Sequence, residues 1–130
     1  MRVLQPAGFA PPKGYANGIA CEGGLVFVSG QIGWDAQHRM VSTGFADQVR
    51  QALRNVVAVI GEAGGKPEHV ARLTWYVTDK REYLAMQREI GAAYREVMGR
   101  HFPAMSVVEV RGLLEDGAKV EIEATAVIPR

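Results

Sequence analysis

The sequence predicts an α/β fold in which strands and helices follow the order β-β-α-β-α-β-β. Residues 49–63 and 80–99 place apolar side chains at helical spacing, whereas residues 70–78 alternate apolar and polar side chains as a strand does. Glycine and proline separate these stretches at short intervals, which favours compact connections. Because 130 residues is close to the usual size of one compact domain, we expect residues 1–130 to form a single domain.

The N-terminal part is expected to contain a hairpin. Residues 25–29 are β-branched or aromatic and apolar on both faces, which suits an internal strand. Residues 19–21 would pair with that strand across a Gly-Gly turn. The proline- and glycine-rich opening through Gly14 predicts an irregular surface segment, and residues 31–43 predict a polar loop.

The remaining elements follow the hairpin at short spacing. The first helix would end at the glycine pair 64–65, and the second would end before Pro103. Two further strands are expected at 106–110 and 119–127. The apolar side of the strand at 70–78 is expected to consist of Ala71, Leu73, Trp75 and Val77.

Two helices cannot cover both faces of such a sheet, so we expect them to share one face. Glu121, Glu123, Arg72 and Tyr76 would then point away from the helices. A face that mixes carboxylates, an arginine and aromatic rings is only partly polar, so we expect another subunit to cover it. The alternative is a solvated sheet face on a monomer.

Composition and charge exclude several classes of function. The net charge is +1 with interspersed signs, which provides no basic footprint for nucleic acid, and no apolar run approaches the length that spans a membrane. The single cysteine, Cys21, is expected to be a buried small hydrophobe, and an unpaired thiol favours a cytoplasmic protein. His38, His69 and His101 lack ligand spacing, so we expect neither metal nor cofactor.

Several segments resemble one known family in order and spacing. Residues 14–17 (G-Y-A-N) look like its G-P-Y-S-Q entry, and residues 27–32 keep its F-V-S-G-Q-I signature. Residues 51–56 resemble its Q-x-L-x-N pattern, residues 102–110 stand where it has F-P-A-R-S-x-V-x-V, and residues 119–124 match its ending. The chain is thus similar to the Rid (YjgF/YER057c/UK114) family over nearly its whole length.

This resemblance implies a chorismate-mutase-like fold and a homotrimer with small-molecule clefts between neighbouring subunits. It also implies hydrolysis of reactive enamines or imines to 2-keto acids and ammonia, without cofactor or metal. The family's F-P-A-R arginine clamps the substrate carboxylate, but this chain has Met105 there, and a thioether supplies neither charge nor a useful donor. Either the substrate has changed, or catalysis is lost, or another cation such as Arg72 or Arg111 compensates.

The other candidate residues come from this resemblance and from their positions next to the matching segments. Glu121 corresponds to the carboxylate that orients or activates water, although an intersubunit salt bridge is an equal alternative. Tyr15, Ser29 with Gly30, and Trp34 would line the cleft, against alternatives of loop packing, a strand exit and cover for the sheet edge. A further cleft position, where many relatives have cysteine, is Val107.

The sequence therefore predicts a Rid-like hydrolase for a reactive enamine or imine that is not a free 2-imino acid. A non-catalytic ligand-binding or regulatory trimer is the alternative, and an endoribonuclease or translation inhibitor is the least favoured reading. The cleft is expected to be more apolar than in arginine-bearing relatives.

Overall fold

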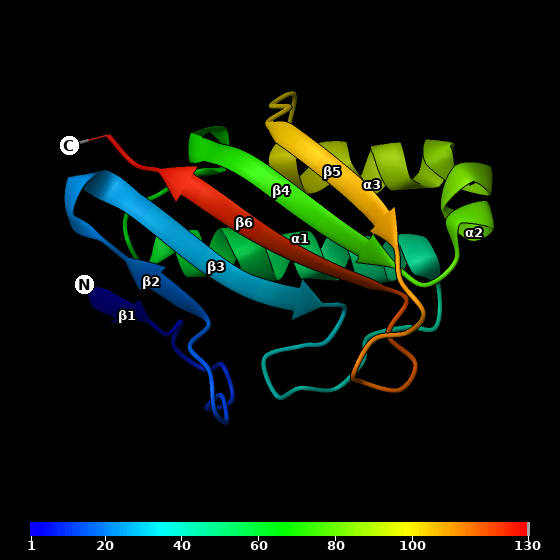
Figure 1. The fold of residues 1–130 in the computed structure, drawn as a ribbon, viewed down its shortest axis with the longest axis horizontal. Helices are drawn as coiled ribbons and strands as arrows, with labels where there is room; N and C mark the ends of the chain where they lie inside the picture. Colours follow the sequence, from blue (N-terminus) through cyan, green and yellow to red (C-terminus); the bar gives the residue numbers. More distant parts are fainter. Residues whose placement is uncertain (130) are drawn as a thin grey trace.

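The computed structural model describes residues 1–129 and contains, in that part of the chain, a six-stranded mixed sheet and three α-helices (Figure 1). The sheet order is β1-β2-β3-β6-β4-β5, and only the β4–β5 pair is parallel. In chain order the elements are β1 (Arg2–Leu4), β2 (Gly18–Ala20), β3 (Leu25–Ile32), α1 (Phe45–Gly61), β4 (Val70–Val77), α2 (Lys80–Ala85), α3 (Gln87–Met98), β5 (Ala104–Glu109) and β6 (Val120–Val127).

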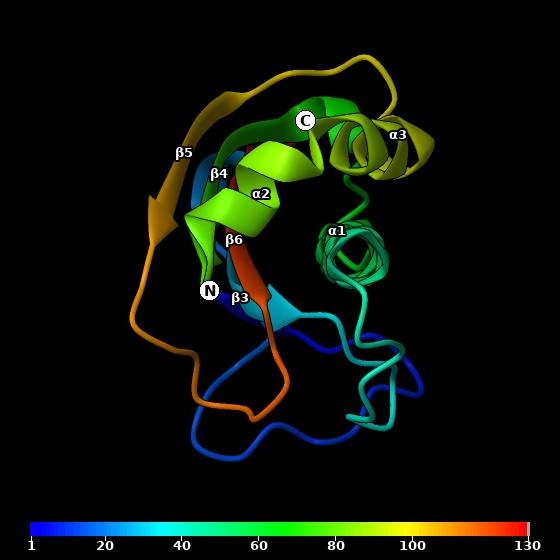
Figure 2. The same cartoon turned by 90° about the vertical axis from the view of Figure 1, so that its right-hand side faces the viewer.

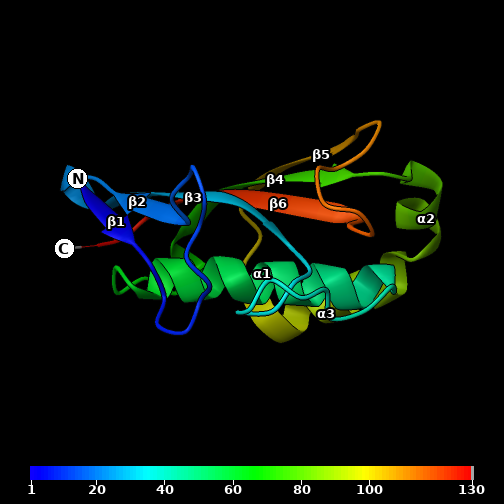
Figure 3. The same ribbon diagram turned by 90° about the horizontal axis from the view of Figure 1, so that it is seen from below.

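Helices α1 and α3 lie side by side against one face of the sheet, and the short helix α2 lies at one end (Figure 3). Seen from the side, the two long helices lie on one side of the sheet and leave its other face open (Figure 2). The expectation that the helices share one face is confirmed. No helix within residues 1–129 combines the length and apolar character needed to cross a membrane.

The core lies between the two long helices and the sheet. Helix α1 buries its apolar stripe from Phe45 to Ile60, and β6 alternates buried and half-buried residues along its length. The largest fully buried side chain is Trp75 of β4. The open face therefore receives the other side chains of β6, among them Glu121 and Glu123.

Three local features differ from the sequence prediction. The opening segment contains a short strand, β1, which pairs with β2. The expected helix at 80–99 is interrupted at Met86, whose backbone leaves the helical region while its side chain still packs on the core. Ala71 is exposed rather than core-facing, because a bulge between Val70 and Arg72 shifts the register of β4 against β6.

Candidate functional site

A bulge in β3 shapes the candidate site. Val28 pairs with Ala124 of β6, but the next regular pair joins Gln31 to Ile122, so Ser29 and Gly30 together lie opposite one residue. This two-against-one arrangement bends the strand and leaves backbone groups outside the ladder, a geometry common beside functional sites. The signature segment therefore stays within β3 but is bent at Ser29 and Gly30.

The bulge forms one wall of a pocket of about 270 Å³, which we call the Glu121 pocket. It lies on the open face, and β3, β6 and three loops contribute to it. The pocket brings together five of the residues predicted from the sequence, which are Tyr15, Ser29, Gly30, Trp34 and Glu121. Its remaining lining consists of Ile32, Leu114 and Glu115.

The Glu121 carboxylate lies directly against Gly30. A methyl group built on Gly30 would come within 2.6 Å of the Glu121 Cδ atom, so only glycine leaves room for this carboxylate. Burial, and secondly repulsion from Glu123, raises the pKa of Glu121 above its ordinary value. Glu121 is half-buried, and these two effects move its pKa toward neutral pH, where a carboxyl group can both donate and accept a proton.

Glu123 itself is held by Tyr76. The Tyr76 hydroxyl donates a 2.7 Å hydrogen bond to Glu123 Oε1, and this hydrogen bond is the main reason why the pKa of Tyr76 is raised. Because that hydrogen bond occupies Glu123, the two carboxylates of β6 differ in environment. Glu121, by contrast, faces the pocket.

The Ser29 hydroxyl belongs to a buried polar network. It donates to the Asn17 carbonyl at 3.1 Å and accepts from Gln31 Nε2 at 3.3 Å. Asn17 and Gln31 are each 3% exposed, so these contacts fix the bulge from behind. Neither partner is a base that would activate Ser29 as a nucleophile, in agreement with the sequence analysis.

The Trp34 ring forms an outer wall of the Glu121 pocket. It stacks on His38 with ring centroids 3.9 Å apart and planes at 8°. From α1, Asn55 Nδ2 donates to the Trp34 carbonyl at 2.9 Å, which ties this loop to the helix. The backbone N–H of Arg39 makes the largest contribution to lowering the pKa of Asp35, whose carboxylate also accepts from the N–H of Gln37 and closes the loop.

Met105 and Val107 lie elsewhere in the chain. They pair in parallel with Leu73 and Trp75, and paired residues of neighbouring strands share a face. Both therefore point toward the helices, on the opposite side of the sheet from Glu121. Within one chain the residues predicted for the cleft fall into two groups.

Met105 borders a second cavity of about 180 Å³, which we call the aromatic pocket. It lies between α3 and the edge strand β5. Tyr94 stacks on Phe102 with centroids 5.6 Å apart, and Trp75 lies edge-on to Tyr83 at 6.3 Å. The lining consists of Trp75, Tyr83, Gln87, Ile90, Gly91, Tyr94, Arg95, Phe102 and Met105.

The cations proposed to compensate for the family arginine lie in neither of these two pockets. Arg72 is exposed on the open face beside Phe27 and Thr74, and Arg111 is exposed in the loop after β5. Arg95 of α3, which the sequence analysis did not consider, lines the aromatic pocket. Its only sequence signal is its spacing of four residues from Gly91 on one helix face.

Two of the histidines contact backbone groups of the chain. His69 Nδ1 accepts from the Lys66 N–H at 2.9 Å, and His101 Nε2 contacts the Val70 carbonyl at 2.6 Å. Within residues 1–129, no cluster of three or more His, Cys, Asp or Glu side chains has the arrangement of a metal site.

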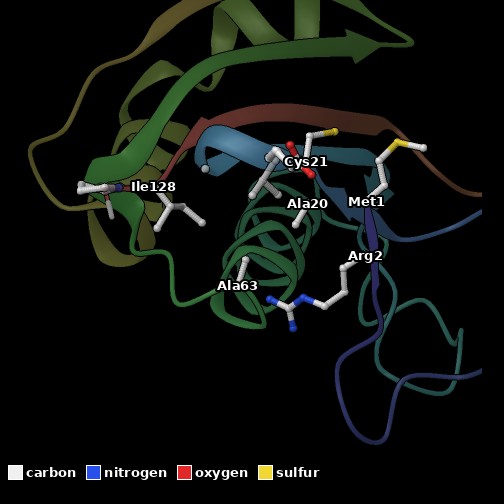
Figure 4. A pocket seen from close by; sticks show the side chains of 10 residues that line it. Met1, Arg2, Ala20, Cys21, Ala63 and Ile128 are labelled. Carbon is white, nitrogen blue, oxygen red and sulfur yellow. The ribbon is translucent and has the colours of Figure 1, made fainter.

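Cys21 lines a cavity of about 420 Å³ near the N-terminus (Figure 4). Its side chain is half-buried rather than buried, because the residue follows the end of β2 instead of lying within the strand. The figure shows Arg2 of β1 and Ala63, which follows α1, on other sides of this cavity.

Sequence reasoning missed the buried amides that hold the site. Gln48 is fully buried and bonds the Ser42 and Gly117 carbonyls, each at 3.0 Å, and the Lys119 N–H at 2.8 Å. It thereby ties α1 to the loop that carries Leu114. A buried polar position inside an apolar helical stripe was the signal that could have revealed it.

The chain is thus an α/β protein with an open-faced sheet, two long helices behind it and a carboxylate pocket at a strand bulge. The family model described as endoribonuclease L-PSP matches residues 6–128. The 2-iminobutanoate/2-iminopropanoate deaminase of Salmonella typhimurium is 36% identical over 94% of this chain and 91% of its own length.

Solved structures agree with this match. The YjgF gene product of E. coli superposes with a TM-score of 0.84 at 31% identity, covering 98% of both chains. E. coli TdcF with bound serine superposes with a TM-score of 0.84 at 27% identity, covering 99% of this chain and all of TdcF. The chain therefore belongs to the Rid (YjgF/YER057c/UK114) family.

Proposed function

We propose that the protein hydrolyses a reactive enamine or imine in clefts between the subunits of a homotrimer. One subunit would contribute the Glu121 pocket, and its neighbour would contribute Met105 and Val107 from β5. The observation on which the proposal rests is the half-buried Glu121, with a raised pKa, beside the bulge at Ser29 and Gly30. The deaminase name of the Salmonella relative supports the reaction class.

The reaction needs one group that exchanges protons at a fixed place. Glu121 in its protonated form gives its proton to the imine nitrogen, and its carboxylate then takes a proton from the attacking water. The water oxygen bonds to the imine carbon, and Glu121 passes the proton taken from water on to nitrogen. Its carboxylate then takes the remaining hydroxyl proton as the C–N bond breaks, ammonia leaves and the carbonyl forms. Tyr15, whose pKa is raised by burial, stays protonated and can donate to the substrate.

The trimer is supported by the open face of the sheet. Phe27, Val108 and Val127 are 47%, 42% and 50% exposed. Phe27 lies beside Arg72 and Thr74, and Val108 pairs with Tyr76. A second chain would bury these apolar side chains. Light scattering should give about three times the 14.2 kDa chain mass, whereas a monomer at micromolar concentration would contradict the shared clefts.

Met105 limits the substrate. Position 105 provides no charge for a carboxylate, so we propose a substrate other than a free 2-imino acid. With imino acids generated in situ by an amino-acid oxidase, we expect little ammonia release. Met105→Arg should raise it if only this clamp is missing. Robust turnover by the unaltered protein would contradict the account of Met105.

The central experiment replaces Glu121. Glu121→Gln should lower hydrolysis of a responsive imine about 10²–10⁴-fold, the usual contribution of a general acid–base group. The matched variant is Glu123→Gln, on the same strand and face but outside the pocket. It should keep turnover and move the acidic limb of the pH profile downward, because repulsion from Glu123 helps to raise the pKa of Glu121. Equal losses in both variants would contradict the assignment.

A non-catalytic ligand-binding trimer is the second candidate, favoured by the uncharged Met105. In that case Glu121→Gln would leave ligand affinity nearly unchanged and there would be no turnover to lose. Cleavage of RNA is not proposed despite the name of the family model, because a net charge of +1 provides little general attraction for phosphates.

A further inference from the structure

The aromatic pocket has the size and lining of a site for one ring. Its volume of about 180 Å³ is close to the ~150 Å³ of apolar cavities that hold a benzene molecule. Trp75, which is 2% exposed, and Tyr94, which is 5% exposed, belong to the core, so this part of the lining is rigid. Met105, which borders the pocket, is 40% exposed and has an adaptable side chain.

A guanidinium lies at the rim of this apolar pocket. Arg95 follows Gly91 by one helical turn, and its Nη1 atom lies 3.2 Å from the position that a Cβ on Gly91 would occupy. The missing side chain at Gly91 thus leaves space in which Arg95 lies back along α3. Both residues line the pocket.

The charge of Arg95 is not neutralised within the described residues. No carboxylate of residues 1–129 lies within 4.0 Å of its guanidinium. The adjacent Glu96 is directed to α1 instead, where its Oε2 atom lies 2.8 Å from both Arg50 Nε and Arg54 Nη2. An unpaired guanidinium beside aromatic rings suits a ligand that is anionic at one end and apolar at the other.

We propose that the aromatic pocket binds a small carboxylate that carries a single ring or a branched aliphatic group. The apolar group would lie against Trp75 and Tyr94 under Met105, and the carboxylate would pair with Arg95. This binding site goes beyond the proposed hydrolysis, since it needs neither Glu121 nor turnover. Short 2-imino acids lack the apolar group, so the proposal does not restore them as substrates.

The test uses the two tryptophans, one in each pocket. A Trp34→Phe protein retains only Trp75, so its fluorescence reports the aromatic pocket alone. Cyclohexanecarboxylate is the probe, and the uncharged cyclohexanecarboxamide is its matched control. We expect a saturable change in Trp75 fluorescence and about two- to fivefold tighter binding of the carboxylate at low salt, the contribution of a solvent-exposed ion pair.

Variants of α3 test the role of Arg95. Arg95→Met should remove the preference for the carboxylate and its salt dependence, whereas Arg95→Lys should retain part of both. Gly91→Leu should fill the pocket and abolish binding of both probes. Arg95 is exposed, and a Cβ at Gly91 would meet only the flexible side chain of Arg95, so these variants should fold, which circular dichroism will verify.

The outcomes separate this proposal from the hydrolase assignment. Absence of saturation, or a preference for the carboxylate that survives Arg95→Met, would overturn the ligand site and leave Glu121-dependent hydrolysis untouched. If Glu121→Gln did not lower hydrolysis, the hydrolase proposal would fail, but ligand binding measured by Trp75 fluorescence would be unaffected.

Discussion

Replacing Gly30 with alanine places a methyl group where the Glu121 carboxylate now lies. The new Cβ would be 2.6 Å from Cδ, 2.7 Å from Oε2 and 2.8 Å from Cγ of Glu121. Ordinary carbon contacts lie at ~3.5 Å, so the carboxylate must retreat by about 0.9 Å. The backbone of Gly30 does not have a positive φ angle, so alanine brings this collision without backbone strain.

This displacement should reduce activity far more than stability. Moving a glutamate side chain off its preferred rotamer costs about 0.5–1.5 kcal/mol. A catalytic group misplaced by about 1 Å can lower the rate ~10²-fold, so we expect a 10- to 100-fold loss of kcat/KM in Gly30→Ala. The assay is ammonia release from a responsive imine, with denaturant unfolding of the same preparation.

A double-mutant cycle tests the cause. If alanine at position 30 acts only by displacing Glu121, it should lower activity no further in a Glu121→Ala background. Gly112→Ala is the control, because a Cβ at Gly112 meets nothing within 4 Å and its φ angle is not positive. Activity of Gly30→Ala within twofold of the parent, or additive losses in the cycle, would refute the reasoning.

Three further results are expected from changes around the site. Gln48→Leu should lower the free energy of unfolding by about 2–4 kcal/mol, because it strands three backbone groups; an exposed glutamine, Gln37→Leu, should change it little by comparison in denaturant titrations. Tyr76→Phe removes one hydrogen bond to Glu123 at a partly exposed position and should cost about 1 kcal/mol or less by the same measurement. Because the pKa of Glu121 is raised in the folded protein, protonated Glu121 contributes stability that is fully present below its ordinary pKa and is lost as the pH rises through the folded pKa. The free energy of unfolding of Glu121→Gln, measured relative to the parent, should therefore increase as the pH rises from 4.5. A flat difference across that range would contradict this sign.

The fold was largely predictable because apolar residues recur at different spacings along its strands and along its helices. The alternation along β6 and the stripe of α1 are properties of consecutive residues, and the structure retains both. The bulge that exposes Ala71 is not such a property, since it depends on how β4 meets β6. The interruption at Met86 was also hidden, because its side chain keeps the helical spacing of the core-facing residues.

Part of the lining of the Glu121 pocket was predictable from the sequence, but its arrangement was not. The sequence pointed to Tyr15, Ser29, Gly30, Trp34 and Glu121, and the structure places them around one pocket, while their roles stay a prediction. No sequence pattern shows that β3 has a bulge at this position, yet that bulge is what sets the strand beside the carboxylate.

The side of the sheet on which Met105 lies could not be read from its own strand. It follows from the parallel register with Leu73 of β4, a contact between segments about thirty residues apart. On that side of the sheet Met105 borders the aromatic pocket, whose lining also includes Arg95 of α3. Arg72 and Arg111 line neither the Glu121 pocket nor the aromatic pocket of one chain, and compensation by either residue stays a prediction.

Assembly through the open face, as proposed, would affect the proton chemistry of Glu121. If a second subunit covers this face, it removes water from around Glu121 and Glu123 together. Desolvation and mutual repulsion, the two causes that already raise the pKa of Glu121, would both grow, because a drier site screens the two charges less. The contact that completes the cleft would thus also bring Glu121 closer to its protonated form at neutral pH. The acidic limb of the pH profile should accordingly lie at higher pH in the assembled protein than in any dissociated form that retains activity.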